Sequence, residues 1–179
     1  MDFGDGQLVE EALNGSVVAF ERLVARYERL VFKIAFGCTG RHDSALDILQ
    51  NVFLKVHRKL AAFRTEGNFR NWVAKIAVNE SINWKRAQRR FRAEELDGAA
   101  SPVSLPSQEG NVRDRETWDI VRKSMQTLNP RCRAAIALRY FDGMAVEEVA
   151  GALGCSVGTA KSLIFRSLKQ MRDHIGVAR

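Results

Sequence analysis

The stretch that decides the fold is VEEVAGALGCSVGTAKSL, residues 146–163. Its first half places Val149 and Leu153 four positions apart, which puts both side chains on one face of a helix. Gly154 can adopt the left-handed backbone that a tight turn between two helices requires. Ser156 is a suitable N-cap for a second helix. The stretch therefore predicts a helix-turn-helix, whose second helix typically enters the major groove of DNA.

The second helix of this motif divides into an apolar and a polar face. Val157, Ala160 and Ile164 or Leu163 are expected to pack against the first helix. The outward candidates for contact with duplex DNA are Thr159, Lys161, Ser162, Phe165, Arg166 and Lys169. Lys and Arg reach phosphates or guanine edges, Ser and Thr reach either, and Phe can contact a thymine methyl group. The alternative is an ordinary antiparallel helix pair with a solvated basic face.

The composition of the whole chain favours a nucleic-acid partner. Its 179 residues hold 28 Lys and Arg against 21 Asp and Glu, a net charge of +7, and a basic protein most often binds a polyanion. Three widely spaced cysteines predict reduced thiols and no metal site. We expect a cytoplasmic protein without membrane insertion, because no apolar run approaches the roughly 20 residues of a membrane span and the acidic N-terminus does not resemble a secretion signal.

The rest of the chain has helical periodicity on both sides of a central segment that lacks it. Apolar residues recur every three or four positions in residues 17–34, 46–60 and 69–84. Candidate N-caps are Ser16, Asp43 or Ser44, Asn68 and Asn129. Residues 93–112 hold two of the three prolines and no periodic apolar face, which predicts a flexible linker. The sequence thus predicts an all-α fold of two small helical bundles, residues 1–92 and 113–179, joined by that linker.

Several stretches resemble conserved regions of one known family. DILQNVFLKVHRKL (47–60) and NFRNWVAKIAVN (68–79) resemble the second conserved region of bacterial sigma factors. LNPR (128–131), LRYFDG (138–143) and VGTAKS (157–162) resemble the fourth. Two such regions joined by a short linker are the layout of the extracytoplasmic-function (ECF) sigma factors. These proteins bind core RNA polymerase, recognise promoter DNA and direct transcription initiation.

The resemblance implies a role for each bundle. The helix that carries Asp47, Gln50, Phe53 and Leu54 would dock on core RNA polymerase. The following loop and helix would capture the minus-ten promoter element as a separated single strand. The residues implied for this contact are Phe63, Arg64, Asn68, Asn79, Trp84, Lys85, Arg86, Arg89 and Arg90. The helix-turn-helix would read the minus-thirty-five element as duplex. For Phe63 the alternative is a core position, and for Asn79 it is a simple solvent-facing side chain.

Energetics favour a polymerase subunit over an independent regulator. Separating about ten base-pair steps costs roughly 14 kcal/mol, at about 1.4 kcal/mol per step, whereas each trapped base returns about 1–3 kcal/mol. A chain of this size therefore needs the additional contacts of a polymerase. The alternative is a polymerase-independent helix-turn-helix regulator, which would bind duplex DNA tightly alone. The sequence carries no Gly-rich phosphate loop, catalytic triad or carboxylate cluster, so we expect neither an enzyme nor a cofactor.

The polymerase-binding helix departs from the family pattern. Leu46 and Asn51 stand where the family carries carboxylates, which should weaken docking onto a basic partner. Either apolar contacts compensate, or a Ser/Thr kinase restores negative charge by phosphorylating Ser44 or Thr39. The resemblance also implies an anti-sigma protein as a partner, bound between the two bundles.

Overall fold

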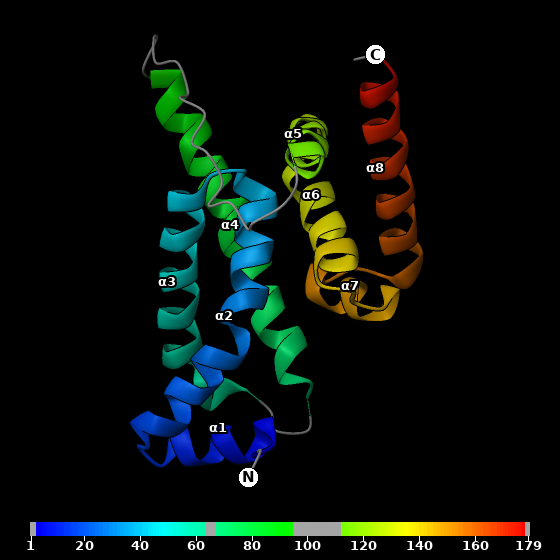
Figure 1. Cartoon of the computed structure of the whole chain (residues 1–179). Coiled ribbons are helices and arrows are strands. Elements are labelled where there is room, and N and C mark those ends of the chain that lie inside the picture. Colours follow the sequence, from blue (N-terminus) through cyan, green and yellow to red (C-terminus); the bar gives the residue numbers. More distant parts are fainter. Residues whose placement is uncertain (1–2, 64–66, 95–111, 178–179) are drawn as a thin grey trace.

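The computed structural model describes the backbone of residues 3–63, 67–94 and 112–177, and the side chains of residues 3–63, 67–88 and 118–176. Within these ranges the regular structure is entirely helical, which confirms the all-α prediction. The first module comprises α1 (Asp5–Leu13), α2 (Val17–Thr39), α3 (His42–Lys59), η1 (Leu60–Ala62) and α4 (Phe69–Glu94). The second comprises α5 (Val112–Thr127), α6 (Pro130–Ile136), η2 (Ala137–Phe141), α7 (Val146–Leu153) and α8 (Val157–Val177). Figure 1 shows the modules side by side.

Side-chain caps fix where the helices of the first module begin. Ser16 Oγ accepts a hydrogen bond from the N–H of Ala19 at 3.2 Å and caps α2. Asn68 Oδ1 accepts from the N–H of Asn71 at 3.1 Å at the start of α4. Both caps agree with the prediction. Helix α3 differs, because it already begins at His42; Asp43 lies in its first turn, where the helix dipole favours a negative charge.

The helix-turn-helix of the second module forms as predicted. Asn129 Oδ1 accepts from the N–H of Cys132 at 2.9 Å and caps α6. Gly154 ends α7 with φ +61°, in the left-handed region that favours glycine. Ser156 Oγ then accepts from the N–H of Thr159 at 3.2 Å and caps α8. The turn between α7 and α8 is therefore set by one glycine and one hydroxyl.

The two modules pack against each other. Helix α4 lies against α6 and α7, and α2 lies against α6 and η2. Buried apolar side chains form one continuous core through both modules, from Leu23 and Ile34 to Leu138 and Met144. The sequence predicts two bundles but not their contact. Of the predicted linker, residues 95–111 lie outside the described residues.

The cysteines differ sharply in accessibility. Cys38 and Cys132 are buried and Cys155 is half-buried. Burial raises the pKa of the Cys38 thiol to about 12, although the nearby Arg133 guanidinium acts in the opposite direction.

We expect iodoacetamide at pH 8 to modify Cys155 well before Cys38, because only the thiolate reacts and Cys38 is almost fully protonated there. The thiolate fraction at Cys38 rises about tenfold per pH unit until the pH reaches that pKa. Peptide mass spectrometry of the native protein at pH 8, 9 and 10 would measure both rates. Equal rates at Cys38 and Cys155 at pH 8 would contradict the buried placement of Cys38.

Candidate nucleic-acid interface

Helix α8 presents a polar face to solvent. All six residues predicted to face duplex DNA are exposed: Thr159, Lys161, Ser162, Phe165, Arg166 and Lys169. Phe165 is 68% exposed, an unusual position for an aromatic ring without a partner to cover it. The opposite face is buried, with Ala160, Leu163 and Ile164 in the core. Each predicted reading residue is therefore accessible from solvent.

Local hydrogen bonds orient two of these side chains. The hydroxyl of Thr159 lies 2.9 Å from Ser156 Oγ, so it belongs to the helix cap. Arg166 Nε donates to the carbonyl oxygen of Ser162 at 3.2 Å, which holds the guanidinium along the exposed face of α8. The remaining N–H groups of a guanidinium tethered through Nε can still form paired hydrogen bonds to a phosphate or to a guanine edge.

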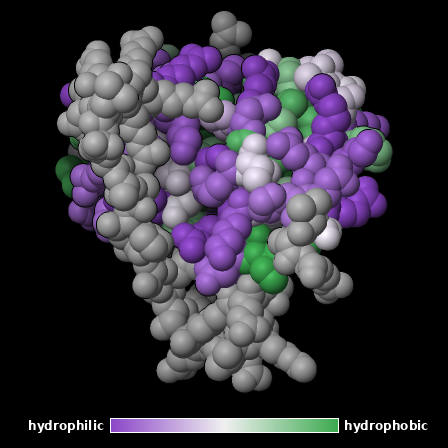
Figure 2. Space-filling model, turned by 90° about the horizontal axis from the view of Figure 1, so that it is seen from above, coloured by the Kyte–Doolittle hydropathy of each residue, from purple (hydrophilic) through white to green (hydrophobic). Residues whose placement is uncertain are grey.

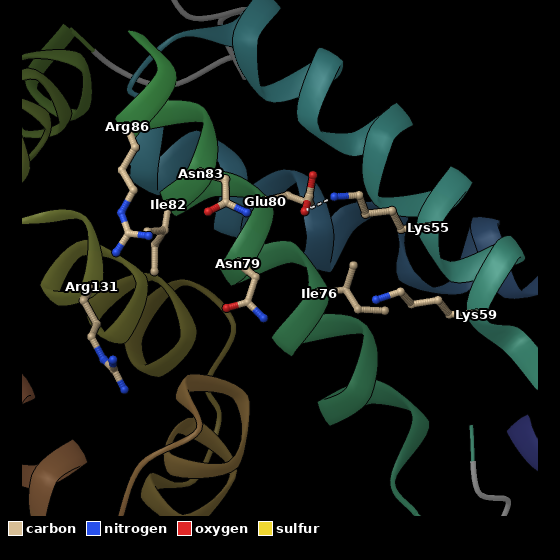
Figure 3. Close-up of a pocket in the computed structure, with 9 residues that line it drawn as sticks. All are labelled: Lys55, Lys59, Ile76, Asn79, Glu80, Ile82, Asn83, Arg86 and Arg131. Atoms are coloured by element: carbon tan, nitrogen blue, oxygen red, sulfur yellow. Dashed lines mark hydrogen bonds and ion pairs between the residues drawn. The ribbon is translucent and has the colours of Figure 1, made fainter. Parts of the chain in front are cut away.

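A polar groove of about 410 Å³ lies between α3, α4 and α6 (Figure 3). It is lined by Lys55, Lys59, Ile76, Asn79, Glu80, Ile82, Asn83, Arg86 and Arg131. Lys55 Nζ pairs with Glu80 Oε1 at 2.5 Å, which neutralises one of the cations. The groove therefore carries a net positive charge, from Lys59, Arg86 and Arg131. The carboxamides of Asn79 and Asn83 also line it. Such a groove suits the phosphates and base edges of a single strand.

Two of the predicted minus-ten residues lie in this groove. Asn79 and Arg86 line it and are exposed on α4. Lys85 and Trp84 are half-buried on the same helix, and Trp84 packs against the core. Asn68 is exposed, but its side chain caps α4. Arg64 and the side chains of Arg89 and Arg90 lie outside the described residues.

Phe63 does not line this groove. Its side chain is 9% exposed and packs edge-on against Phe69, with ring centroids 5.0 Å apart, and against Trp72 at 5.3 Å. Tyr27 extends the cluster through Phe69. The structure therefore favours the core alternative for Phe63 and does not bring it together with Asn79. The aromatic cluster instead holds Phe63, at the end of η1, against the first turn of α4.

The predicted polymerase-binding residues fall on two faces of α3. Asp47, Gln50 and Leu54 are exposed, and the spacing of three and four places them on one face. Phe53 is 8% exposed and belongs to the core, so its place in the docking surface stays a prediction that the burial does not support. At 100° per residue, position 53 lies about 100° from position 54, toward the buried side. Phe53 anchors the helix and leaves the docking face to its neighbours.

The two predicted phosphorylation sites are buried. Thr39 Oγ1 donates to the carbonyl oxygen of Ala35 at 2.9 Å and accepts from the N–H of Arg41 at 3.3 Å. Ser44 is buried in the first turn of α3. A kinase needs an accessible hydroxyl, and this arrangement presents neither.

Three further features of the described residues are the polarity of one face, the length of the apolar helices and the grouping of potential metal ligands. Seen from above, hydrophilic residues dominate the described part of this face, and hydrophobic ones form small separate patches (Figure 2). In residues 3–63, 67–94 and 112–177 no helix is both long and apolar enough to cross a membrane. The same residues contain no group of three His, Cys, Asp or Glu side chains placed to hold a metal ion.

Sequence reasoning missed the cations that the second module and α3 add to the groove. Arg131 comes from α6, and its guanidinium donates to the carbonyl oxygen of Leu153 at 2.8 Å. Lys59 comes from the last turn of α3. Lys59 follows His57 and Arg58 in sequence, but only the packing of α4 against α3 and α6 brings Lys59 and Arg131 beside Asn79. No local pattern in the sequence identifies them.

Both modules match known family models. Residues 23–91 match sigma-70 region 2, and residues 118–171 match sigma-70 region 4. The ECF RNA polymerase sigma-E factor of Escherichia coli K12 is 33% identical over 180 residues, covering 96% of this chain and 94% of that protein. The sigma-E factor of Haemophilus influenzae is 31% identical and covers 96% and 95%.

Two solved structures share the fold. CnrH in complex with the cytosolic domain of CnrY superimposes with a TM-score of 0.73 at 23% identity, covering 98% of this chain and 99% of that one. The sigma factor RpoE of Bartonella quintana, in complex with the anti-sigma factor NepR, gives a TM-score of 0.75 at 24% identity, covering 91% and 100%.

Proposed function

The chain belongs to the ECF family of RNA polymerase sigma factors, and from this premise we propose how its two modules recruit polymerase to a promoter. It is a promoter-specificity factor for transcription initiation. The observation that carries this function is the presence of both sigma regions, in order, in a chain aligned over 96% of its length with a sigma-E factor. A polymerase-independent regulator is not favoured.

The second module reads the minus-thirty-five element as duplex. The exposed face of α8 supports this role, because its cations and hydroxyls suit phosphates and base edges. Phe165 stands where it can contact a thymine methyl group. Arg166 is the strongest candidate for a paired hydrogen bond to guanine, since its guanidinium is already oriented along the helix.

The first module captures the minus-ten element as a single strand. The α3–α4 wall of the groove, which carries Lys59, Asn79 and Arg86, supports this role, because a carboxamide can bind base edges and the two cations attract phosphates. Lys59 joins these residues in our proposal. Arg64, Asn68, Trp84, Lys85, Arg89 and Arg90 remain predictions of the resemblance alone.

The exposed face of α3 binds core RNA polymerase. Asp47 and Gln50 supply polar contacts, and Leu54, 55% exposed, supplies an apolar anchor. Leu46 is also exposed beside them, which supports apolar compensation for the missing carboxylates. Phosphorylation of Thr39 or Ser44 stays a prediction that would require these buried hydroxyls to become accessible first.

Restoring a carboxylate at Asn51 tests whether the missing negative charge on α3 weakens binding to polymerase. Asn51→Glu is expected to raise the affinity for core polymerase about three- to tenfold at low salt, mainly through faster association, because a further negative charge complements a basic partner. Surface plasmon resonance at two salt concentrations would measure this. Asn51→Gln is the matched control, because it adds the same length without charge. An equal gain from both variants would contradict an electrostatic origin.

The partners proposed for the chain are core RNA polymerase, promoter DNA in duplex and single-stranded form, and an anti-sigma protein. RpoE of Bartonella quintana is bound to an anti-sigma factor, and a partner of this kind would control the present chain by sequestration. The chain performs no chemistry of its own in this proposal. It acts in the cytoplasm, because RNA polymerase does.

A mobility-shift experiment with and without core polymerase tests the proposed function. Labelled fragments of the source genome are incubated with the protein alone, with core polymerase alone and with both, in the presence of heparin as competitor. We expect heparin-resistant complexes at specific fragments only when both proteins are present. Tight, specific complexes formed by the protein alone would favour the independent regulator instead.

A further inference from the structure

The two modules approach each other closely where α2 meets η2. A Cβ atom added to Gly37 would lie 2.8 Å from the Cβ of Ala137, nearer than side chains approach in real proteins. Met125 and Phe141 surround the same position at 3.6 Å. Only glycine permits this approach without a shift of one module. The absence of a side chain at Gly37 therefore lets the backbone of α2 lie directly against Ala137 of η2.

Polar groups of the second module engage the C-terminal end of α2. Arg133 is 4% exposed, and its Nη1 donates to the carbonyl oxygen of Cys38 at 2.9 Å. The same guanidinium donates to the carbonyl oxygens of Leu128 and Gln126 in its own module. A cation at a helix C-terminus is stabilised by the helix dipole. Arg133 thus joins both modules through buried backbone carbonyls.

A cluster of charges closes the other edge of the contact. Arg70 of α4 pairs with the carboxylate of Asp142, and its Nη1 lies 3.6 Å from Glu148 Oε1 on α7. Lys33 of α2 lies 3.7 Å from Asp142 and donates to the carbonyl oxygen of Phe141 at 2.7 Å. The cations come from the first module and the acids from the second. The Asp142 side chain is only 12% exposed, so water screens these pairs less than it would on an open surface.

This closed arrangement cannot span a promoter. Elements centred near minus ten and minus thirty-five are about 25 base pairs apart, or about 85 Å at 3.4 Å per pair. A compact protein of this length has a radius of gyration of about 16 Å, or about 40 Å across. Residues 95–111 could bridge at most about 60 Å, which is enough for the modules to separate. The modules must part before both elements are bound.

We propose that the charge cluster of Arg70, Lys33, Asp142 and Glu148, together with the Gly37–Ala137 contact, is an intramolecular latch that holds the free protein closed and lowers its affinity for polymerase. The closed state is inferred from these contacts. Its inhibition of polymerase binding rests on the proposed function. Closure places α7 against α4, the helix proposed to read the minus-ten element. Apparent affinity falls in proportion to the fraction of molecules that are open.

Small-angle X-ray scattering of the full chain, with polymerase binding measured in parallel, tests the latch. Arg70→Ala removes both ion pairs, and Gly37→Leu separates the modules by steric clash. We expect each variant to raise the radius of gyration by about 3 Å or more above the compact value of about 16 Å. Affinity for core polymerase should rise about three- to tenfold in Arg70→Ala and at least about tenfold in Gly37→Leu.

The control is Arg26→Ala. It breaks the ion pair of Arg26 with Asp5 at 2.7 Å, inside the first module, and should change neither quantity; the arginine side chains are similarly exposed, 32% for Arg26 and 34% for Arg70. Circular dichroism verifies that each variant keeps its helices. A radius unchanged in both latch variants overturns the latch, and an enlarged radius without higher affinity overturns its inhibitory role. If the wild type fails to bind polymerase, the proposed function is wrong, whereas the radius of gyration still decides whether the latch exists.

Discussion

Leu54→Asp is expected to weaken binding to core RNA polymerase by roughly 100-fold, about 3 kcal/mol, and to abolish transcription. Leu54 is an exposed apolar side chain near the end of α3, on the same face as Asp47. If polymerase covers this face, Leu54 becomes buried and acts as an anchor of the interface. The substitution removes that anchor and places a carboxylate in a desolvated interface. Fluorescence anisotropy with labelled protein and core polymerase would measure the change.

Leu13→Asp is the matched control for this variant. Leu13 is 47% exposed, close to the 55% of Leu54, and it is the last residue of α1, outside the proposed docking helix. Its replacement should leave polymerase affinity within about twofold. Equal losses in the two variants would show that the effect is a general consequence of added charge, and α3 would lose its assignment as the docking helix.

Arg166→Glu is expected to lower the affinity of the polymerase complex for its promoter by about 5- to 150-fold, that is, by about 1–3 kcal/mol. The exposed guanidinium is lost, and a carboxylate takes its place against a polyanion. Filter binding with one promoter and with single-base variants of its minus-thirty-five element would measure the effect at several salt concentrations.

The pattern of loss distinguishes what Arg166 contacts. If it binds a phosphate, the charge-neutral Arg166→Gln weakens all sequences about equally and lowers the salt slope by about one. If it binds a guanine edge, discrimination at one base pair is lost instead. Lys123→Glu, an exposed cation on α5, serves as the control. A loss of the same size in Lys123→Glu would remove the special role of α8.

The sequence predicts the helices and the exposed face of α8 well, because both depend on short-range rules. Caps such as Ser16 and Asn129 act within three residues, and a helix exposes positions at fixed angular spacing. The turn at Gly154 is predicted for the same reason. These features are local, so one sequence is enough to predict them.

The sequence fails where distant segments meet. Phe53 and Phe63 are assigned functional positions by resemblance, yet both are buried, because packing against α2 and α4 decides their exposure. Lys59 and Arg131 reach one groove from two modules, and Arg70 meets Asp142 across 72 positions of sequence. Helical periodicity relates residues only a few positions apart, so it does not predict which distant residues come into contact.

The most direct test of the central claim is to map RNA start sites on the genome in vitro. Core RNA polymerase is supplied with total genomic DNA, with and without the protein, and the 5′ ends of the transcripts are sequenced. The account predicts new, discrete start sites that appear only with the protein and share two upstream elements at constant spacing. Identical start sites with and without the protein would contradict it.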